Sequence, residues 1–425
     1  MITLNCVPCA LLMLSLTMPA AAQDVTTDGT PAPSEGGWKV RWDDHPEVEW
    51  IGRLRVEIHA RVQSDGRTSD AAIADDKGDA FDVGRRRIGV QGDVGRYVAF
   101  TLEREIETTN PWRDVWVNVR PSRIAQVRAG QFKIPFGLEE TTGGGSLDFI
   151  YRSLVSRRLA PGRDRGLMLH GRLAGRTLGY EVGTFAHDGD NARPNGGVRV
   201  FGGRTVAGRV VAEPFGRSKA PWSDLRIGVA FTRSSVPEGF PAIRGRSVLG
   251  VSFFDSDVWV RGTRRRIGLQ AQWRPGPVSV ASEFIRVADD RRGQGPDGTN
   301  LAPFLARGWY VSGAWVVAGA RQVAHADAPL RPLFQGGFGS VQLAVRLERF
   351  RLGGGPDGQE PSASPRAGSV ASNREGAMTL GLNWHPNRWI RIDSNLIREA
   401  IGEAPGSPYP HLRFWSRLVR FQVSL

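Results

Sequence analysis

The sequence predicts an all-β protein, a transmembrane antiparallel β-barrel of about sixteen strands. Segments in which apolar and polar residues alternate recur along most of the 425 residues, and the connections between them are alternately tight and long. Beyond residue 23 no apolar run approaches the roughly 20 residues of a membrane helix. Because alternation with a period of two is typical of strands, a helical membrane protein is excluded and a barrel is favoured.

The first 22 residues are expected to be a signal peptide. Residues 10–18 are apolar or small and lead into an Ala-Ala-Ala run that favours cleavage after Ala22. Both cysteines, Cys6 and Cys9, lie inside this leader. The mature chain is therefore expected to contain no disulfide and to use no thiolate chemistry.

The next segment, residues 23–47, is rich in Asp, Pro and Gly and is interpreted as a flexible periplasmic arm. The barrel domain is expected over residues 48–425. Its clearest strands are 225–232, 266–273 and 341–348, where apolar residues occupy every second position and polar or small residues occupy the others. The face with polar or small residues would enclose water, and the apolar face would meet lipid.

The connections distinguish a membrane barrel from a soluble sandwich, which usually has only about seven to nine strands. Tight connections are predicted at 92–96, 274–277 and 385–388. Long ones are predicted at 134–165, 233–262, 287–306 and 351–375. Short periplasmic turns that alternate with long outer loops are the pattern of a transmembrane barrel, which must close because an open edge in lipid leaves backbone groups unpaired.

The end of the chain agrees with this interpretation. Val419, Phe421, Val423 and Leu425 share one face of a predicted last strand. Outer-membrane barrels commonly end on such a strand, usually with a terminal Phe, from which Leu425 departs. The 13 Trp and 19 Phe would suit aromatic girdles at the membrane interfaces.

Arginine dominates the charge of the chain. Lys plus Arg is 56, only Lys39, Lys77, Lys133 and Lys219 are lysines, and the net charge is +13. A GC-rich genome explains part of this bias, but it does not explain where the arginines fall. Several occupy the polar face of predicted strands and others crowd one long connection. The residues predicted to line a pore and bind anions are Arg85, Arg87, Lys133, Arg152, Arg157, Arg158, Arg163, Arg165, Arg226, Arg264, Arg266 and Arg346.

Guanidinium groups on the inner face would concentrate anions, because low-dielectric walls focus the field in a water-filled pore. They also match the geometry of phosphate oxygens and stay charged at any relevant pH. In the triplets 85–87 and 264–266 only alternate members can face the interior. Acidic residues such as Asp114, Glu283 and Glu348, with Asp393, could share the interior and would reduce a preference for anions.

Three runs of residues resemble the phosphate-selective porin O and P family. They are Ala129–Glu139 (AGQFKIPFGLE), Phe149–Leu154 (FIYRSL) and Leu159–Leu169 (LAPGRDRGLML). Further similar pieces, in family order, are Gly84–Ile88, Gly276–Val280 with Glu283, and Thr379–Trp384. The resemblance covers nearly all of residues 50–425.

The resemblance implies a sixteen-stranded barrel, a homotrimer, and a constriction where the third outer loop, about residues 134–165 here, folds into the lumen. It implies passive diffusion of small anions, phosphate or polyphosphate, across the bacterial outer membrane. Lys133 matches the lysine of the family's Gln-Phe-Lys run and Arg163 matches its Pro-Gly-Arg element. Outer-membrane lipid and lipopolysaccharide are the expected surroundings.

Other classes of function find little support. Two GxGxxG matches, 293–298 and 353–358, contain Pro-Asp-Gly turns and do not open a helix after a strand, so no nucleotide site is predicted. No metal site, cofactor or enzymatic activity is predicted, and the export signal argues against nucleic acid as a partner. The alternatives left open are a general, weakly selective porin and a non-transport outer-membrane barrel, either an adhesin or an enzyme.

Overall fold

The computed structural model describes most of the chain beyond residue 36. The described residues are 37–42, 45–50, 52–71, 79–106, 111–189, 203–216, 218, 221–241, 243–254, 259–323, 326–354, 370–402 and 411–425. The chain divides into two units, Met1–Gly37 and Trp38–Leu425, and every element below belongs to the second unit. The predicted signal peptide and residues 23–36 of the predicted arm lie outside the described residues.

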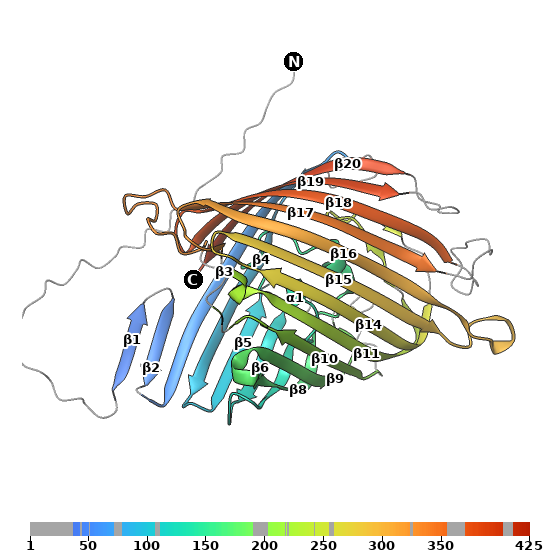
Figure 1. The fold of residues 1–425 in the computed structure, drawn as a ribbon, viewed down its shortest axis with the longest axis horizontal. Helices are drawn as coiled ribbons and strands as arrows, with labels where there is room; N and C mark the ends of the chain where they lie inside the picture. Colours follow the sequence, from blue (N-terminus) through green and yellow to red (C-terminus); the bar gives the residue numbers. More distant parts are fainter. Residues whose placement is uncertain are drawn as a thin grey trace, which may run out of the picture. The chain divides into compact units, whose positions relative to one another are not determined.

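The second unit is a closed antiparallel barrel of sixteen strands (Figure 1). Each strand pairs with the next along the chain, and β20 pairs with β3 to close the ring, from Ser416 opposite Ser69 to Ser424 opposite Arg61. Closure leaves no sheet edge within the ring, as the backbone requires in lipid. The predicted fold class is confirmed.

The barrel strands differ in length. The six strands from β5 to β10 have 8–11 residues, and the other strands of the ring have 13–18. The bounds are β3 (Leu54–Ser69), β4 (Asp79–Val94), β5 (Val98–Glu105), β6 (Trp112–Val119), β7 (Gln126–Lys133), β8 (Arg163–Leu173), β9 (Leu178–Phe185), β10 (Thr205–Ala212), β11 (Arg226–Pro241), β14 (Trp259–Trp273), β15 (Val278–Arg291), β16 (Leu301–Ala318), β17 (Ser340–Gly354), β18 (Val370–His385), β19 (Ile390–Gly402) and β20 (Leu412–Ser424).

The other elements lie in connections or before the ring. They are the strands β1 (Trp38–Trp42), β2 (Pro46–Trp50), β12 (Gly245–Arg246) and β13 (Ser252–Phe254), the helices α1 (Leu138–Thr141) and α2 (Leu154–Leu159), and the short 3-10 turns Ala174–Arg176, Pro221–Asp224 and Pro296–Gly298. No helix among the described residues combines the length and apolarity needed to cross a membrane.

Apolar side chains point outward along the barrel strands. Ile227, Val229 and Phe231 are 47–48% exposed, and Leu343, Val345 and Leu347 are 43–49% exposed. The residues between them, such as Arg346, are buried on the opposite face. No second protein layer covers these apolar residues within the described part of the chain, so this surface faces lipid, as the alternation predicts.

The connections follow the predicted alternation with two differences. The tight turns after β4, β14 and β18 are confirmed, and so is the long connection 134–162. The strands flanking the other long connections extend several residues further than predicted, for example β15 to Arg291. On the short-turn side, β16 and β17 are joined by a longer segment, 319–339.

The strands β1 and β2, most of whose residues the sequence assigns to the arm, form an antiparallel pair. β1 pairs with β2, from Trp38 opposite Trp50 to Trp42 opposite Pro46, and β2 pairs with β3. Alternation explains this pair, since Trp38, Val40 and Trp42 share one face and Lys39 and Arg41 share the other.

Candidate functional site

The connection between β7 and β8 carries α1 and α2 and packs against the inside of the opposite wall. Phe136, Val155 and Leu159 join a buried apolar cluster with Ile285 of β15. α2 contacts β15, β16 and β17. Ser153 caps α2, because its side chain accepts a hydrogen bond from the Ser156 amide. We call residues 134–162 the inner loop.

Side chains of the far wall hold the backbone of the inner loop. Glu348 of β17 accepts from the Leu154 amide at 2.6 Å, and Asn395 of β19 accepts from the Ile150 amide at 2.9 Å. Arg391 donates to the carbonyl of Leu147 at 2.6 Å. The loop therefore crosses the inside of the barrel, from its origin at β7 to β17 and β19. This confirms the constriction loop expected near residues 134–165.

Arg346, a predicted pore residue, is part of this anchorage. Its guanidinium is 1% exposed and lies 3.1 Å from Glu139 and 3.2 Å from Glu348. It also donates to the Tyr151 carbonyl at 3.1 Å and lies over the Phe149 ring. The loop and the wall thus enclose this side chain and leave it almost no contact with open water.

Arg264 and Arg266 of β14 also bind protein rather than open space. Both are buried and both contact Asp188, which follows β9, and Arg264 also lies 2.7 Å from Asp289. Arg266 donates to the Leu159 carbonyl of the inner loop at 2.7 Å. Burial alone would raise the pKa of Asp188, but the charges and hydrogen bonds of Arg266 and Arg264 outweigh it and hold that pKa well below its usual value.

Arg157 and Arg158 lie on α2 and tie the inner loop to the β11–β14 connection. Arg157 donates to the Val248 carbonyl at 2.9 Å, and Arg158 donates to the carbonyls of Arg246 and Ser247 at 3.3 Å. Burial lowers the pKa of Arg158 to about 10. These two guanidinium groups therefore connect the inner loop to the β11–β14 connection.

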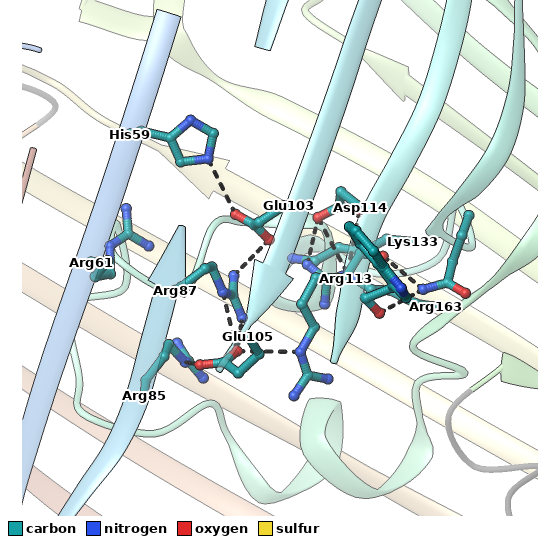
Figure 2. A network of polar contacts seen from close by, with 12 residues as sticks. His59, Arg61, Arg85, Arg87, Glu103, Glu105, Arg113, Asp114, Lys133 and Arg163 are labelled. Carbon is teal, nitrogen blue, oxygen red and sulfur yellow. Dashed lines mark hydrogen bonds and ion pairs between the residues drawn. The ribbon is translucent and has the colours of Figure 1, made fainter. Parts of the chain in front are cut away.

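An open cavity of about 540 Å³ lies on the other side of the inner loop. One side is formed by strands from β3 to β9, and the other by Thr141, Gly143 and Gly144 of the loop. The charged groups that line it are Arg61, Arg87, Arg128, Lys133 and Arg163, with Glu103, Asp114 and Glu181. This cavity is the candidate site, and most of its charged residues appear in Figure 2.

Glu105 organises the arginines at one side of the cavity. Its carboxylate lies 2.8 Å from Arg87, 3.2 Å from Arg113 and 4.0 Å from Arg85 (Figure 2). Arg87 bridges to Glu103 at 3.0 Å. A single carboxylate thus holds three guanidinium groups in one cluster, which leaves an excess of positive charge there.

Lys133 and Arg152 bind backbone carbonyls in the first part of the inner loop. The Lys133 ammonium donates to the carbonyls of Glu140 and Thr142 at 2.5 and 2.7 Å. Arg152 donates to the carbonyl of Thr142 at 2.7 Å and bridges to Glu140 at 3.4 Å. Arg163 pairs with Asp114 at 2.8 Å. Lys133 and Arg163 still line the cavity, whereas Arg152 does not.

A second hollow of about 520 Å³ lies toward the short-turn end and shares Glu181 with the first. Its basic residues are Arg123, Arg172, Arg209 and Arg226. Arg209 lies 3.0 Å from Glu181, and Arg226 lies 3.1 Å from Glu213. Both hollows are lined by residues of β7, β8 and β9 and lie beside the inner loop, and we call the two hollows together the passage.

The predicted site residues thus fall into three groups. Arg87, Lys133, Arg163 and Arg226 line the passage, and Arg85 is linked to Arg87 through the shared carboxylate of Glu105. Arg152, Arg157, Arg158, Arg264, Arg266 and Arg346 anchor the inner loop. Arg165 is exposed and lines a separate groove with the exposed side chains of Leu102 and Trp112. Their proposed role in anion binding stays a prediction.

The sequence interpretation missed several basic residues of the passage, chiefly Arg61, Arg128 and Arg209. Each alternates with apolar neighbours on its strand, for example Arg128 between Val127 and Ala129. That signal was present, but isolated arginines stand out less than triplets. Among the described residues no group of three or more His, Cys, Asp or Glu side chains could hold a metal ion.

The sequence model described as phosphate-selective porin O and P matches residues 56–400. No curated protein sequence matches the chain significantly. Solved structures with a similar fold include outer-membrane expressed OmpT of Vibrio cholerae, with a TM-score of 0.54, 12% identity, and coverage of 91% of this chain and 100% of that one. An in-vitro folded trimer form of the same protein has a TM-score of 0.53 and 12% identity, with coverage of 88% of this chain and 100% of that one. OprB of Pseudomonas putida has a TM-score of 0.53 and 11% identity, with coverage of 88% of this chain and 94% of that one.

Proposed function

Because the chain belongs to the phosphate-selective porin O and P family, we propose that small anions, phosphate or polyphosphate among them, diffuse through it passively. The family and the barrel make the protein an outer-membrane porin, which is a channel. The proposal adds the identity of the solute to this assignment as a porin. The route is the passage beside the inner loop.

One observation carries the preference for anions. Arg61 and Arg128 line the cavity, and neither has an acidic oxygen within 4.0 Å among the described residues. Arg128 lies over the Trp116 ring at 4.2 Å, and its Nε has no hydrogen-bond partner in the described structure. Uncompensated guanidinium groups in a water-filled constriction raise the local concentration of anions. Their paired donors fit phosphate oxygens.

The remaining basic groups extend this field along the passage. Arg85, Arg87 and Arg113 share the single carboxylate of Glu105, and Arg209 and Arg226 continue toward the short-turn end. Successive weak sites allow an anion to move on without being trapped, which conduction requires.

A weakly selective porin is the second candidate. Glu103, Asp114 and Glu181 line the same cavity and neutralise part of its charge, as in the Arg163–Asp114 pair. In that case cations would also pass, and the arginines would serve the fold more than the solute. The two candidates differ in the sign and size of the ion preference.

We also propose export and assembly in keeping with the family. Residues 1–22 would direct export, and three copies would form a homotrimer. The trimer form of the structurally similar Vibrio protein supports this assembly.

Phosphate block of chloride current tests the proposed solute. Single channels in planar bilayers bathed in potassium chloride should lose current as phosphate is added. The variant Arg61→Gln/Arg128→Gln should be blocked more weakly, while Arg53→Gln/Arg96→Gln, which removes two exposed turn-side charges, should behave as the wild type. Equal block of all three proteins would leave the weakly selective porin as the better account.

A further inference from the structure

A row of arginines crosses the outer, lipid-facing surface of the barrel. Arg286 of β15 lies directly opposite Arg307 of β16, Arg307 lies opposite Arg351 of β17, and Arg351 lies opposite Arg374 of β18. All four side chains are exposed, on the face that alternates with the buried interior. We call these four residues the outer arginine row.

The row has no internal counter-charge in the described part of the chain. No acidic group described there lies within 4.0 Å of any of the four guanidinium groups. Residues directly opposite on paired strands have Cβ atoms about 4.5–5.5 Å apart, and like charges in such pairs repel. A row of four repeats that repulsion three times. An external anion between the guanidinium groups would remove it.

The position of the row identifies the source of the anion. On the same outer face, Trp309 and Phe284 lie two residues nearer the short turns than Arg307 and Arg286 do. Beyond Trp309 and Phe284 this face is apolar. On β17, Leu347 and Val345 follow Arg349 and Arg351 in the same way. The row therefore lies at the border of the lipid-facing belt, at its long-loop end. In outer-membrane barrels the long loops are external.

More exposed arginines continue the row around the same rim. Arg349 lies beside Arg351, and Arg398 lies over the Trp415 ring. Arg413 and Arg417 of β20 are also exposed on this face. Clusters of arginine at a membrane border attract anionic headgroups, and guanidinium binds phosphate through paired donors.

We propose that the outer arginine row is a binding site for the phosphate groups of phosphorylated glycolipid in the outer leaflet. The phosphates lie between neighbouring guanidinium groups, and the acyl chains lie along the apolar belt beside Trp309 and Leu347. This site is on the outside of the barrel and does not depend on the ion preference of the passage.

Binding of bisphosphorylated lipid A to the purified, detergent-solubilised protein tests the proposal. The fourfold variant Arg286→Gln/Arg307→Gln/Arg351→Gln/Arg374→Gln should bind at least tenfold more weakly than the wild type. A matched variant loses the same charge at the opposite rim through Arg53→Gln/Arg96→Gln/Arg321→Gln/Arg331→Gln, and it should bind as the wild type. Dephosphorylated lipid A should bind weakly to every variant.

Each other outcome overturns the proposal. Unchanged affinity of the fourfold variant would exclude the row, and an equal loss in the matched variant would assign binding to net charge. Equal affinity for dephosphorylated lipid A would exclude phosphate recognition, and displacement by inorganic phosphate at the same phosphate concentration would favour free phosphate as the ligand. The double variant Arg307→Gln/Arg351→Gln, which removes the two central charges, should show an intermediate loss and serves if the fourfold variant does not assemble. The reversal potential across a potassium chloride gradient should not change in the fourfold or the double variant. This result would distinguish the outer arginine row from the passage.

Discussion

Arg266 and Asp188 form a buried ion pair inside the barrel, with side chains 0% and 4% exposed. Arg266 Nη2 lies 2.7 Å from Asp188 Oδ2, and a second bond joins Nη1 to Oδ1. The same guanidinium donates to the Leu159 carbonyl, so the pair links the segment after β9 to the inner loop. Removal of the carboxylate would leave both Arg266 and Arg264 under-compensated.

Asp188→Asn should therefore destabilise the folded barrel. Breaking a buried pair by removing one partner costs about 3–5 kcal/mol, because a charge stays buried without compensation. Unfolding in urea, followed by tryptophan fluorescence, measures this change. Asp297→Asn, at an exposed position in a turn, is the control and should change stability little. Equal stability of all three proteins would show that the pair does not hold the loop.

The stability difference between the wild type and Asp188→Asn should depend on pH. Burial opposes the ionised form of Asp188, but Arg266 and Arg264 hold its folded pKa below the unfolded value of about 3.9. A depressed pKa contributes stability that is present above the unfolded pKa and is lost as the pH falls through the folded one. The difference should stay constant from about pH 8 to 5 and shrink below about pH 4. A difference that shrinks already near neutral pH would contradict this ion pair.

Gly145→Ala should narrow the passage. A Cβ on Gly145 would lie 2.6 Å from Cζ of Arg61, so the guanidinium must move. A Cβ on Gly313, on the outer face of β16, would make only ordinary contact with the Ser279 carbonyl, at 3.7 Å. Single-channel conductance should fall in Gly145→Ala and stay at the wild-type level in Gly313→Ala. Equal conductance in the two variants would place the narrowest point elsewhere.

Glu105→Gln should increase the preference for anions. The change removes the carboxylate shared by Arg85, Arg87 and Arg113 and leaves their charges in place. One unit of charge a few ångströms from the ion path in a wet passage is worth about 1 kcal/mol, or about fivefold in permeability ratio. Asp297→Asn, which removes one exposed negative charge from the turn between β15 and β16, is the control and should leave the ratio unchanged. A ratio that falls in Glu105→Gln would mean that this carboxylate does not face the ion path.

The alternation of residues predicted the barrel, because a lipid-facing surface imposes a period of two wherever a strand crosses the membrane. It predicted outward Ile227 and inward Arg266 correctly. It could not predict the strand ends, since beyond the lipid a strand such as β15 continues under hydrogen bonding alone.

The candidate site was predicted less well than the fold. Charge and position could not distinguish Arg346, which is enclosed by Glu139 and Glu348, from Arg61, which lines open space. The difference depends on where the inner loop lies, and contacts between residues far apart in sequence decide that. Arg157 and Arg158 show the same limit: their place on the loop was foreseen, but their carbonyl partners at 246–248 were not.

The reversal potential across a potassium chloride gradient tests the central claim most directly. The account predicts that the wild-type channel in planar bilayers passes chloride more readily than potassium, and that Arg61→Gln/Arg128→Gln reduces this preference while Arg53→Gln/Arg96→Gln does not. A reversal potential that indicates potassium as the more permeant ion would contradict the claim that uncompensated guanidinium groups of the passage select anions.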